Sequence, residues 1–135
     1  MSNSIHDIPG DHEYAVIAPA QSPGTVYGVV IFEAPYACKV QRVEVIPEES
    51  ITGAATNNFK WELFNKGTDG TGTASLKAQT FSAGSNVGGT VVTSWYNPAT
   101  KLALAAGTIL ELVKTENGAG MLMPNTRVNT VVQGN

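Results

Sequence analysis

The chain has 135 residues, the size of one domain that buries roughly two thirds of its unfolded surface. Charged residues make up only 14% of the chain, and the net charge is −3. Its eight basic residues are scattered, whereas nucleic-acid phosphates are bound by clustered Lys and Arg. No apolar run approaches the ~20 residues of a membrane helix, and the first residues lack the basic and apolar regions of a signal peptide. We therefore expect a soluble protein made in a cytosol, without nucleic acid or membrane as a partner.

The first twelve residues are polar, contain Pro9 and Gly10, and show no hydrophobic period. We expect residues 1–12 to form a flexible N-terminal arm ahead of a single domain, residues 13–135. Two interpretations of the arm stay open. Either it is simply disordered, or it orders against a neighbouring subunit with Ile5 and Ile8 as its apolar anchors.

Three strands are expected in the first third of the domain, over residues 14–18, 25–33 and 38–47. Gly28 lies inside the second, which suggests a bulge or a close backbone approach at that position. In the third, Val43 and Val45 alternate with charged residues, but Val40 is out of phase with them. A bulge near Gln41 would bring the two halves of this strand into one register.

The most informative stretch is TNNFKWELFNKGTDGTGT, residues 56–73. Phe59, Trp61 and Leu63 occupy every second position with charges between them, which predicts a half-buried strand with its aromatics on one face. The glycine-rich residues 65–72 follow, and they have the composition of a hairpin loop. A calcium loop would need more carboxylates, and a phosphate-binding glycine loop would have to precede a helix.

Further strands are expected over residues 74–82, 90–96, 108–115 and 126–133, with loops at 48–55 and 83–89. Residues 101–106 fit either a short strand or a helical turn, and the neighbouring strands favour a strand. Eight or nine short strands without an amphipathic helix predict an all-β fold: a two-sheet antiparallel sandwich of jelly-roll or Greek-key type.

The sequence offers little chemistry. His6 and His12 lie in the arm without the further ligands that a metal site needs. Cys38 is the only cysteine, and its apolar surroundings favour a buried structural thiol. The acids Glu44, Glu62 and Glu111 alternate with apolar residues, so we interpret them as solvated charges on the outer faces of sheets rather than as a catalytic pair. We predict no catalytic residue, cofactor or metal, and expect a protein that is not an enzyme.

The remaining candidates for function are residues that could form a binding surface. Five aromatic residues are candidates for a sugar platform or an interface, with about half expected in the core: Tyr27, Tyr36, Phe64, Trp95 and Tyr96. The apolar segment 121–124 is either a plug of the core or a contact for another subunit, and Met121 and Met123 are its candidate interface residues.

A family resemblance rests on a succession of segments: APY at 34–36 before a valine-rich strand, ITGA at 51–54 with TNNFKWELF at 56–64, NKGTDGTGT at 65–73, LKAQTF at 76–81, and KLALAAGTILELV at 101–113. Over about residues 25–133 the chain resembles the small capsid decoration (cement) proteins of tailed bacteriophages. These are signatures of strands and turns, and no contact residue can be matched.

The resemblance implies a β-sandwich that binds the major capsid protein on the outside of the virion, commonly as a homotrimer, and stabilises the shell. Low charge and a symmetric trimer are compatible with multivalent binding to many equivalent sites. Two alternatives remain. One is another phage particle component, such as a head fibre or tail module; the other is a carbohydrate-binding β-sandwich module.

Overall fold

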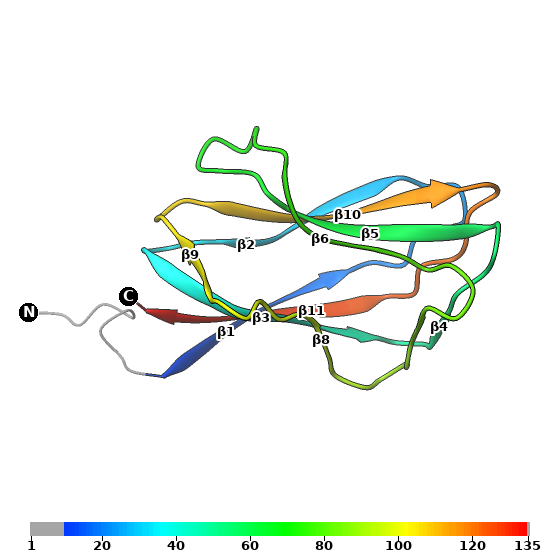
Figure 1. The fold of residues 1–135 in the computed structure, drawn as a ribbon, viewed down its shortest axis with the longest axis horizontal. Helices are drawn as coiled ribbons and strands as arrows, with labels where there is room; N and C mark the ends of the chain where they lie inside the picture. The colour runs from blue at the N-terminus through cyan, green and yellow to red at the C-terminus, as the bar shows by residue number, and fades with distance from the viewer. Residues whose placement is uncertain (1–9, 135) are drawn as a thin grey trace, which may run out of the picture.

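The computed structural model describes residues 10–134, and residues 1–9 and 135 lie outside that description. Two layers of antiparallel strands face each other along the whole length of the domain (Figure 1). The strands are β1 (Asp11–Ala18), β2 (Tyr27–Glu33), β3 (Cys38–Pro47), β4 (Ile51–Thr52), β5 (Asn58–Asn65), β6 (Ala74–Thr80), β7 (Asn86–Val87), β8 (Thr93–Tyr96), β9 (Leu102–Leu104), β10 (Ile109–Asn117) and β11 (Thr126–Gly134).

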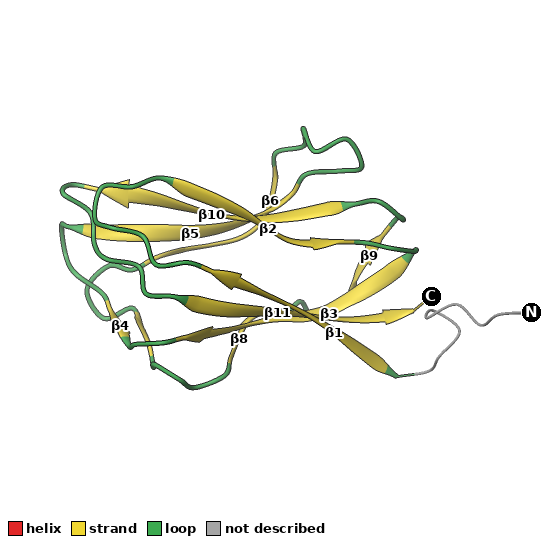
Figure 2. Ribbon diagram, turned by 180° about the vertical axis from the view of Figure 1, so that it is seen from behind, coloured by secondary structure: helices red, strands yellow, loops and turns green. Residues whose placement is uncertain are grey.

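One sheet has the order β1-β11-β3-β8, with β9 also paired to β3, and the other has the order β2-β10-β5-β6. Only β5 and β6 are neighbours both in sequence and in a sheet, whereas β1, β2 and β3 alternate between the two layers (Figure 2). This confirms the predicted fold class, an all-β antiparallel sandwich whose sheet neighbours come from distant parts of the chain.

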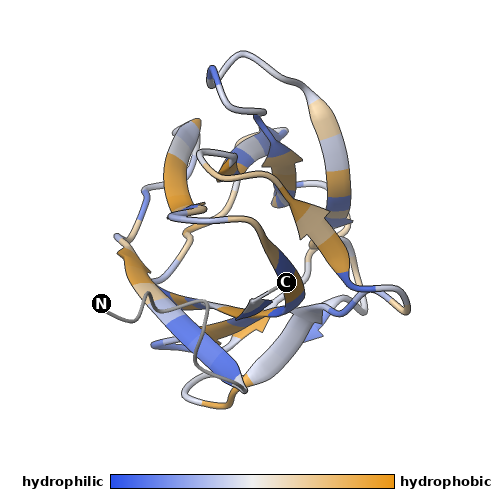
Figure 3. Cartoon of the chain, turned by 90° about the vertical axis from the view of Figure 1, so that its left-hand side faces the viewer, coloured by the Kyte–Doolittle hydropathy of each residue, from blue (hydrophilic) through white to orange (hydrophobic). Residues whose placement is uncertain are grey.

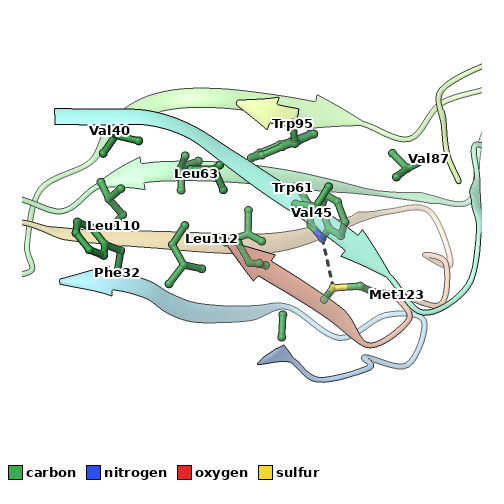
Figure 4. Packing of buried hydrophobic residues seen from close by; sticks show 14 of the residues in the cluster. Phe32, Val40, Val45, Trp61, Leu63, Val87, Trp95, Leu110, Leu112 and Met123 are labelled. Atoms are coloured by element: carbon green, nitrogen blue, oxygen red, sulfur yellow. Dashed lines mark hydrogen bonds between the residues drawn. The ribbon is translucent and has the colours of Figure 1, made fainter. Parts of the chain in front are cut away.

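The predicted central strand is β5, and its alternation determines what it buries. Phe59, Trp61 and Leu63 are fully buried, whereas Lys60 and Glu62 between them are half-buried on the outer face. Trp61 packs edge-on against Phe81 and Trp95, with ring centroids 5.2 and 5.9 Å away. Its indole Nε1 donates a hydrogen bond to Sδ of Met123 at 3.4 Å (Figure 4).

Both layers supply this core. Viewed along the sandwich, apolar and polar positions alternate on strands of the two sheets (Figure 3). Val43, Val45 and Val128 come from one sheet, and Leu110 and Leu112 come from the other. The core is thus the space between the two sheets, as period-2 patterning requires.

The bulge expected in β3 is present. Val131 of β11 pairs with Arg42 and Val132 pairs with Val40, so Gln41 is the extra residue and both valine sets of β3 face the core. Gly28 is neither a bulge nor a point of close backbone approach: the bulge of this strand lies at Ile31, and the atoms nearest to Gly28 across the sheet belong to side chains. A Cβ there would lie 3.2 Å from the Glu111 carboxylate on the neighbouring strand.

Several boundaries differ from the sequence-based expectation. β1 begins at Asp11, inside the residues assigned to the arm, and His12 is therefore a strand residue. The loops expected at 48–55 and 83–89 contain β4 and β7, which pair with each other. The strand expected from Thr90 begins only at Thr93, and Thr90 itself has a φ of 59°, outside the region of regular strands. The domain boundary at residues 12–13 stays a prediction.

Candidate binding surface

The four interface residues predicted from sequence do not form one surface among the described residues. Ile5 and Ile8 lie outside the described range. Met121 is half-buried, and Met123 is only 2% exposed because it closes the core over Trp61. Leu122, between them, is the residue that points outward and is half exposed. The structure therefore places Met123 in the core, as the plug interpretation describes, and leaves Leu122 as the exposed side chain of this segment.

The aromatic side chains also fail to form a platform. Trp95 is only 4% exposed, its Nε1 donates to Oε1 of Gln79 at 2.7 Å, and Lys77 Nζ lies 5.5 Å from the centre of its ring. The other four are half-buried: Tyr27, Tyr36, Phe64 and Tyr96. A sugar platform needs an open aromatic face, and Trp95 does not provide one.

The three acids singled out in the sequence each pair with a nearby base on an outer face. Arg42 Nε lies 2.9 Å from Glu44, and Lys60 Nζ lies 3.2 Å from Glu62. Lys66 Nζ lies 3.8 Å from Glu111. The hydrogen bond from the Ser75 hydroxyl, assisted by that from Lys60, holds the pKa of Glu62 below its ordinary value. The interpretation as outer-face charges is confirmed for all three.

Other reactive groups are either buried or dispersed. Cys38 is fully buried, as expected, and burial raises the pKa of its thiol. Within residues 10–134 no three His, Cys, Asp or Glu side chains are grouped so as to hold a metal ion. The same range contains no helix with the length and apolar character needed to cross a membrane. His6 lies outside the described residues.

One polar pair, Lys114 and Glu116, was not predicted from the sequence. Lys114 and Glu116 follow Leu110 and Leu112 in the same alternation, so both side chains enter the space between the sheets, where they form an ion pair. Lys114 is 1% exposed; its Nζ donates to the Ser22 carbonyl at 3.1 Å and lies 5.7 Å from the ring centre of Phe59. Oε2 of Glu116 accepts from Met121 N at 3.1 Å. The pair thereby connects the turns at Ser22 and Met121 to β10. The two-residue alternation of β10 is the sequence signal that could have predicted it.

A groove of about 390 Å³ lies on the outer face of the β1-β11-β3 sheet. Ile17, Arg127 and Ile46 lie directly opposite one another on the three strands and line it. Glu48 and Thr90 are further lining residues, and Asn125 Nδ2 fixes Glu48 by a hydrogen bond of 3.0 Å. Ile17 is 61% exposed, so this end of an otherwise polar face is apolar.

The loop beside the groove is held firmly in a strained conformation. Thr90 N donates to the Pro47 carbonyl at 2.6 Å, and Gly89 N donates to Oγ of Ser50 at 3.0 Å. A Cβ on Gly89 would lie 2.5 Å from the Ser50 backbone nitrogen, so only glycine fits this approach. Non-glycine residues with positive φ persist only where the surroundings impose them, and they cluster at functional sites.

This loop presents two valines to solvent. Val91 and Val92 directly follow Thr90 and are 59% and 55% exposed. We use the name groove patch for these two valines together with Ile17, which lines the groove. Val91 and Val92 are connected to the groove through Thr90, which is one of its lining residues. Exposed apolar side chains beside a groove are a feature of protein interaction sites. A smaller pair, Val26 and Val30, lies at β2 in the other sheet.

No family model matches the chain, and no curated protein sequence does. Two solved structures of infectious bursal disease virus are similar at 13% sequence identity. The structure of the Gx strain covers 92% of this chain with a TM-score of 0.37, and the VP2 subviral particle covers 95% with a TM-score of 0.35. This chain spans about a third of each, 32% and 34%. At these TM-scores the similarity assigns no property of those proteins to this chain.

Proposed function

We propose that this chain is a structural, non-enzymatic component of a tailed-phage particle, which binds the outer surface of the capsid and stabilises the shell. The observation that carries the proposal is the groove patch: three exposed aliphatic side chains on a rigid loop and strand, beside a groove with charged residues at its rim. The resemblance of residues 25–133 to capsid decoration proteins supplies the partner, the major capsid protein.

The physical argument concerns how a small domain binds a shell. An apolar patch of this size gives a modest interface, but a homotrimer would present three copies at once, so that the second and third contacts are intramolecular. A loop held by backbone hydrogen bonds loses little entropy on binding. In this proposal the protein is made in the host cytoplasm and resides on the capsid surface, without cofactor, nucleic acid or membrane.

Cryo-microscopy of the parent virion tests the proposal directly. We expect density for the sandwich on the outside of the head, with the groove patch facing the capsid protein. Density only in the tail or at a head fibre would replace this location with the alternative particle component. Virions without any density for the chain would reject a structural role in the particle.

The carbohydrate-binding alternative loses its tryptophan, because Trp95 lies within the core cluster. A glycan array with the purified protein tests it separately. We expect no binding, and a specific glycan whose binding survives serine substitutions at Val91 and Val92 would count against the capsid-binding proposal.

A further inference from the structure

Edge strands expose unpaired backbone groups, and most edges of this sandwich carry a protective irregularity. β2, β6 and β8 each contain one extra residue relative to the strand they pair with: Ile31, Leu76 and Trp95. β9 has only three residues, and β6 also carries Lys77. Bulges, short lengths and lysines are the devices by which proteins prevent edge-to-edge pairing.

β1 is different from every other described edge of the two main sheets. Its eight residues pair with β11 in one unbroken register, without a bulge. Its sequence, DHEYAVIA, contains no proline, glycine or lysine. Beside it lies a slot of about 260 Å³ between β1 and β2, lined by Tyr14 and Val16 on one side and Phe32 on the other. A long, regular and partly apolar edge is a template for another strand.

We propose that β1 pairs edge to edge with β1 of a second copy, antiparallel about a two-fold axis at Ala15. The sheet β1-β11-β3-β8 of one copy then continues into the same sheet of the other. Residues directly opposite each other in two antiparallel strands have their side chains on the same face of the sheet. In a two-fold pair of identical strands, the axis must therefore pass through one residue, which lies opposite its own copy.

The side chains of β1 fit this pairing and favour a second copy as the occupant. With Ala15 at the axis, Tyr14 lies opposite Val16 of the partner subunit, and both face the slot. Glu13 lies opposite Ile17 of the partner subunit, so no two acids face each other. The negative charges of Asp11 and Glu13 are confined to the first three residues of the strand, which places them at opposite ends of the paired strands.

The two-fold contact uses the edge of β1 that faces away from β11, whereas the proposed capsid contact uses the groove patch on the outer face. Ile17 belongs to both surfaces, so each contact is tested at residues of its own: Ala15 for the two-fold contact, and Val91 with Val92 for the capsid contact. A two-fold contact added to a homotrimer joins trimers to one another; added to a monomer it gives a dimer. Breaking it returns a dimer to monomers and an assembly of trimers to single trimers, so the mass falls at least twofold.

The first test compares two matched alanines on edge strands, Ala15 of β1 and Ala78 of β6, both exposed. Ala15→Lys places two lysines opposite each other at the axis and should lower the mass measured by light scattering after size exclusion at least twofold. Ala78→Lys adds the same charge at a bulged edge and should leave the mass as in the wild type. Circular dichroism and thermal unfolding verify that both variants fold.

The second test traps the contact. Paired residues across antiparallel strands have Cα atoms about 4.5–5.5 Å apart, within the range of a disulfide. Ala15→Cys should form a disulfide-linked dimer under mild oxidation, while Ala78→Cys stays monomeric on a non-reducing gel; the native Cys38 is buried and silent. Equal masses for the wild type and Ala15→Lys at all concentrations, with no disulfide dimer of Ala15→Cys, would overturn the proposal.

Discussion

The interior around Trp61 and the surface around Val91 differ in how their apolar side chains are covered. In the interior, each aromatic side chain is covered by others, and the one indole nitrogen at the centre finds a sulfur acceptor. At the surface, a strained loop is held by backbone hydrogen bonds while its two valines contact solvent. The first region uses apolar groups for stability, and the second keeps them available for another molecule. Substitutions should therefore separate stability from association.

The largest effect on stability is expected at Trp61. Trp61→Ala removes a fully buried ring that contacts Phe59, Phe81 and Trp95, and we expect the free energy of unfolding to fall by about 4 kcal/mol. Urea unfolding followed by circular dichroism measures it. A loss below about 1 kcal/mol would show that the core is not organised around this residue.

Sequence patterning was sufficient for this interior region. The alternation of Phe59, Trp61 and Leu63 depends only on the two-residue period of a strand, and the out-of-phase Val40 located the bulge at Gln41. Local spacing thus predicted the fold class, the buried face of the central strand and the bulge in β3, because burial on one face produces a two-residue alternation in the sequence. Several strand boundaries were not predicted by it.

The groove and the groove patch could not be predicted from the spacing of residues in the sequence. The groove joins Ile17, Ile46 and Arg127, which are brought together by the pairing order of three strands and not by spacing. Val91 and Val92 have the composition of a strand, but they lie between Thr90, whose φ is positive, and the start of β8 at Thr93. That conformation depends on contacts with residues 47–50, which single-sequence reasoning does not reveal.

The second largest effect is expected at the buried ion pair. Glu116→Gln leaves Lys114 charged and unpaired at 1% exposure, which should lower the free energy of unfolding by about 3 kcal/mol. The matched control is Glu62→Gln, whose partner Lys60 is on the outer face with 36% of its side chain exposed. For that surface pair we expect a change below about 1 kcal/mol. Equal losses in the two variants would contradict the difference between interior and surface.

A gain in stability is expected at Thr130. Its side chain is fully buried on β11, and its hydroxyl has no hydrogen-bond partner within the described residues. Thr130→Val keeps the shape and removes the unpaired polar group, so the free energy of unfolding should rise by about 1 kcal/mol. Chemical denaturation of the variant beside the wild type measures the change, and a loss of stability would indicate that the hydroxyl has a partner.

The stability should also fall at alkaline pH through Tyr36. Burial, followed by the hydrogen bond with Tyr14, raises the pKa of Tyr36 to about 12 from an ordinary value of 10.0. Because the folded protein holds the proton more tightly, this contribution is complete below pH 10 and is lost as the pH rises toward 12. Unfolding midpoints between pH 9 and 12 should therefore fall less steeply for Tyr36→Phe than for the wild type. Identical slopes would show that Tyr36 ionises equally in both states.

The smallest effect on stability is expected at the groove patch, where the effect on association should be greatest. The double variant Val91→Ser, Val92→Ser changes two side chains that are more than half exposed, so unfolding should shift by less than about 0.5 kcal/mol. If the patch is buried against a capsid, each valine contributes about 1.5 kcal/mol, and the dissociation constant should rise roughly a hundredfold for the pair.

Co-sedimentation with capsids that lack the protein measures this binding. The matched control is Val26→Ser, Val30→Ser, which changes two valines of similar exposure at β2. That variant should bind as the wild type does, because Val30 lies in β2 of the other sheet and Val26 directly precedes β2. Weakened binding in both variants would point to general loss of apolar surface, whereas weakened binding in the control alone would move the capsid contact to β2. Only loss confined to the groove patch connects the strained turn at Thr90 to the function, since the two valines directly follow that turn and are exposed there.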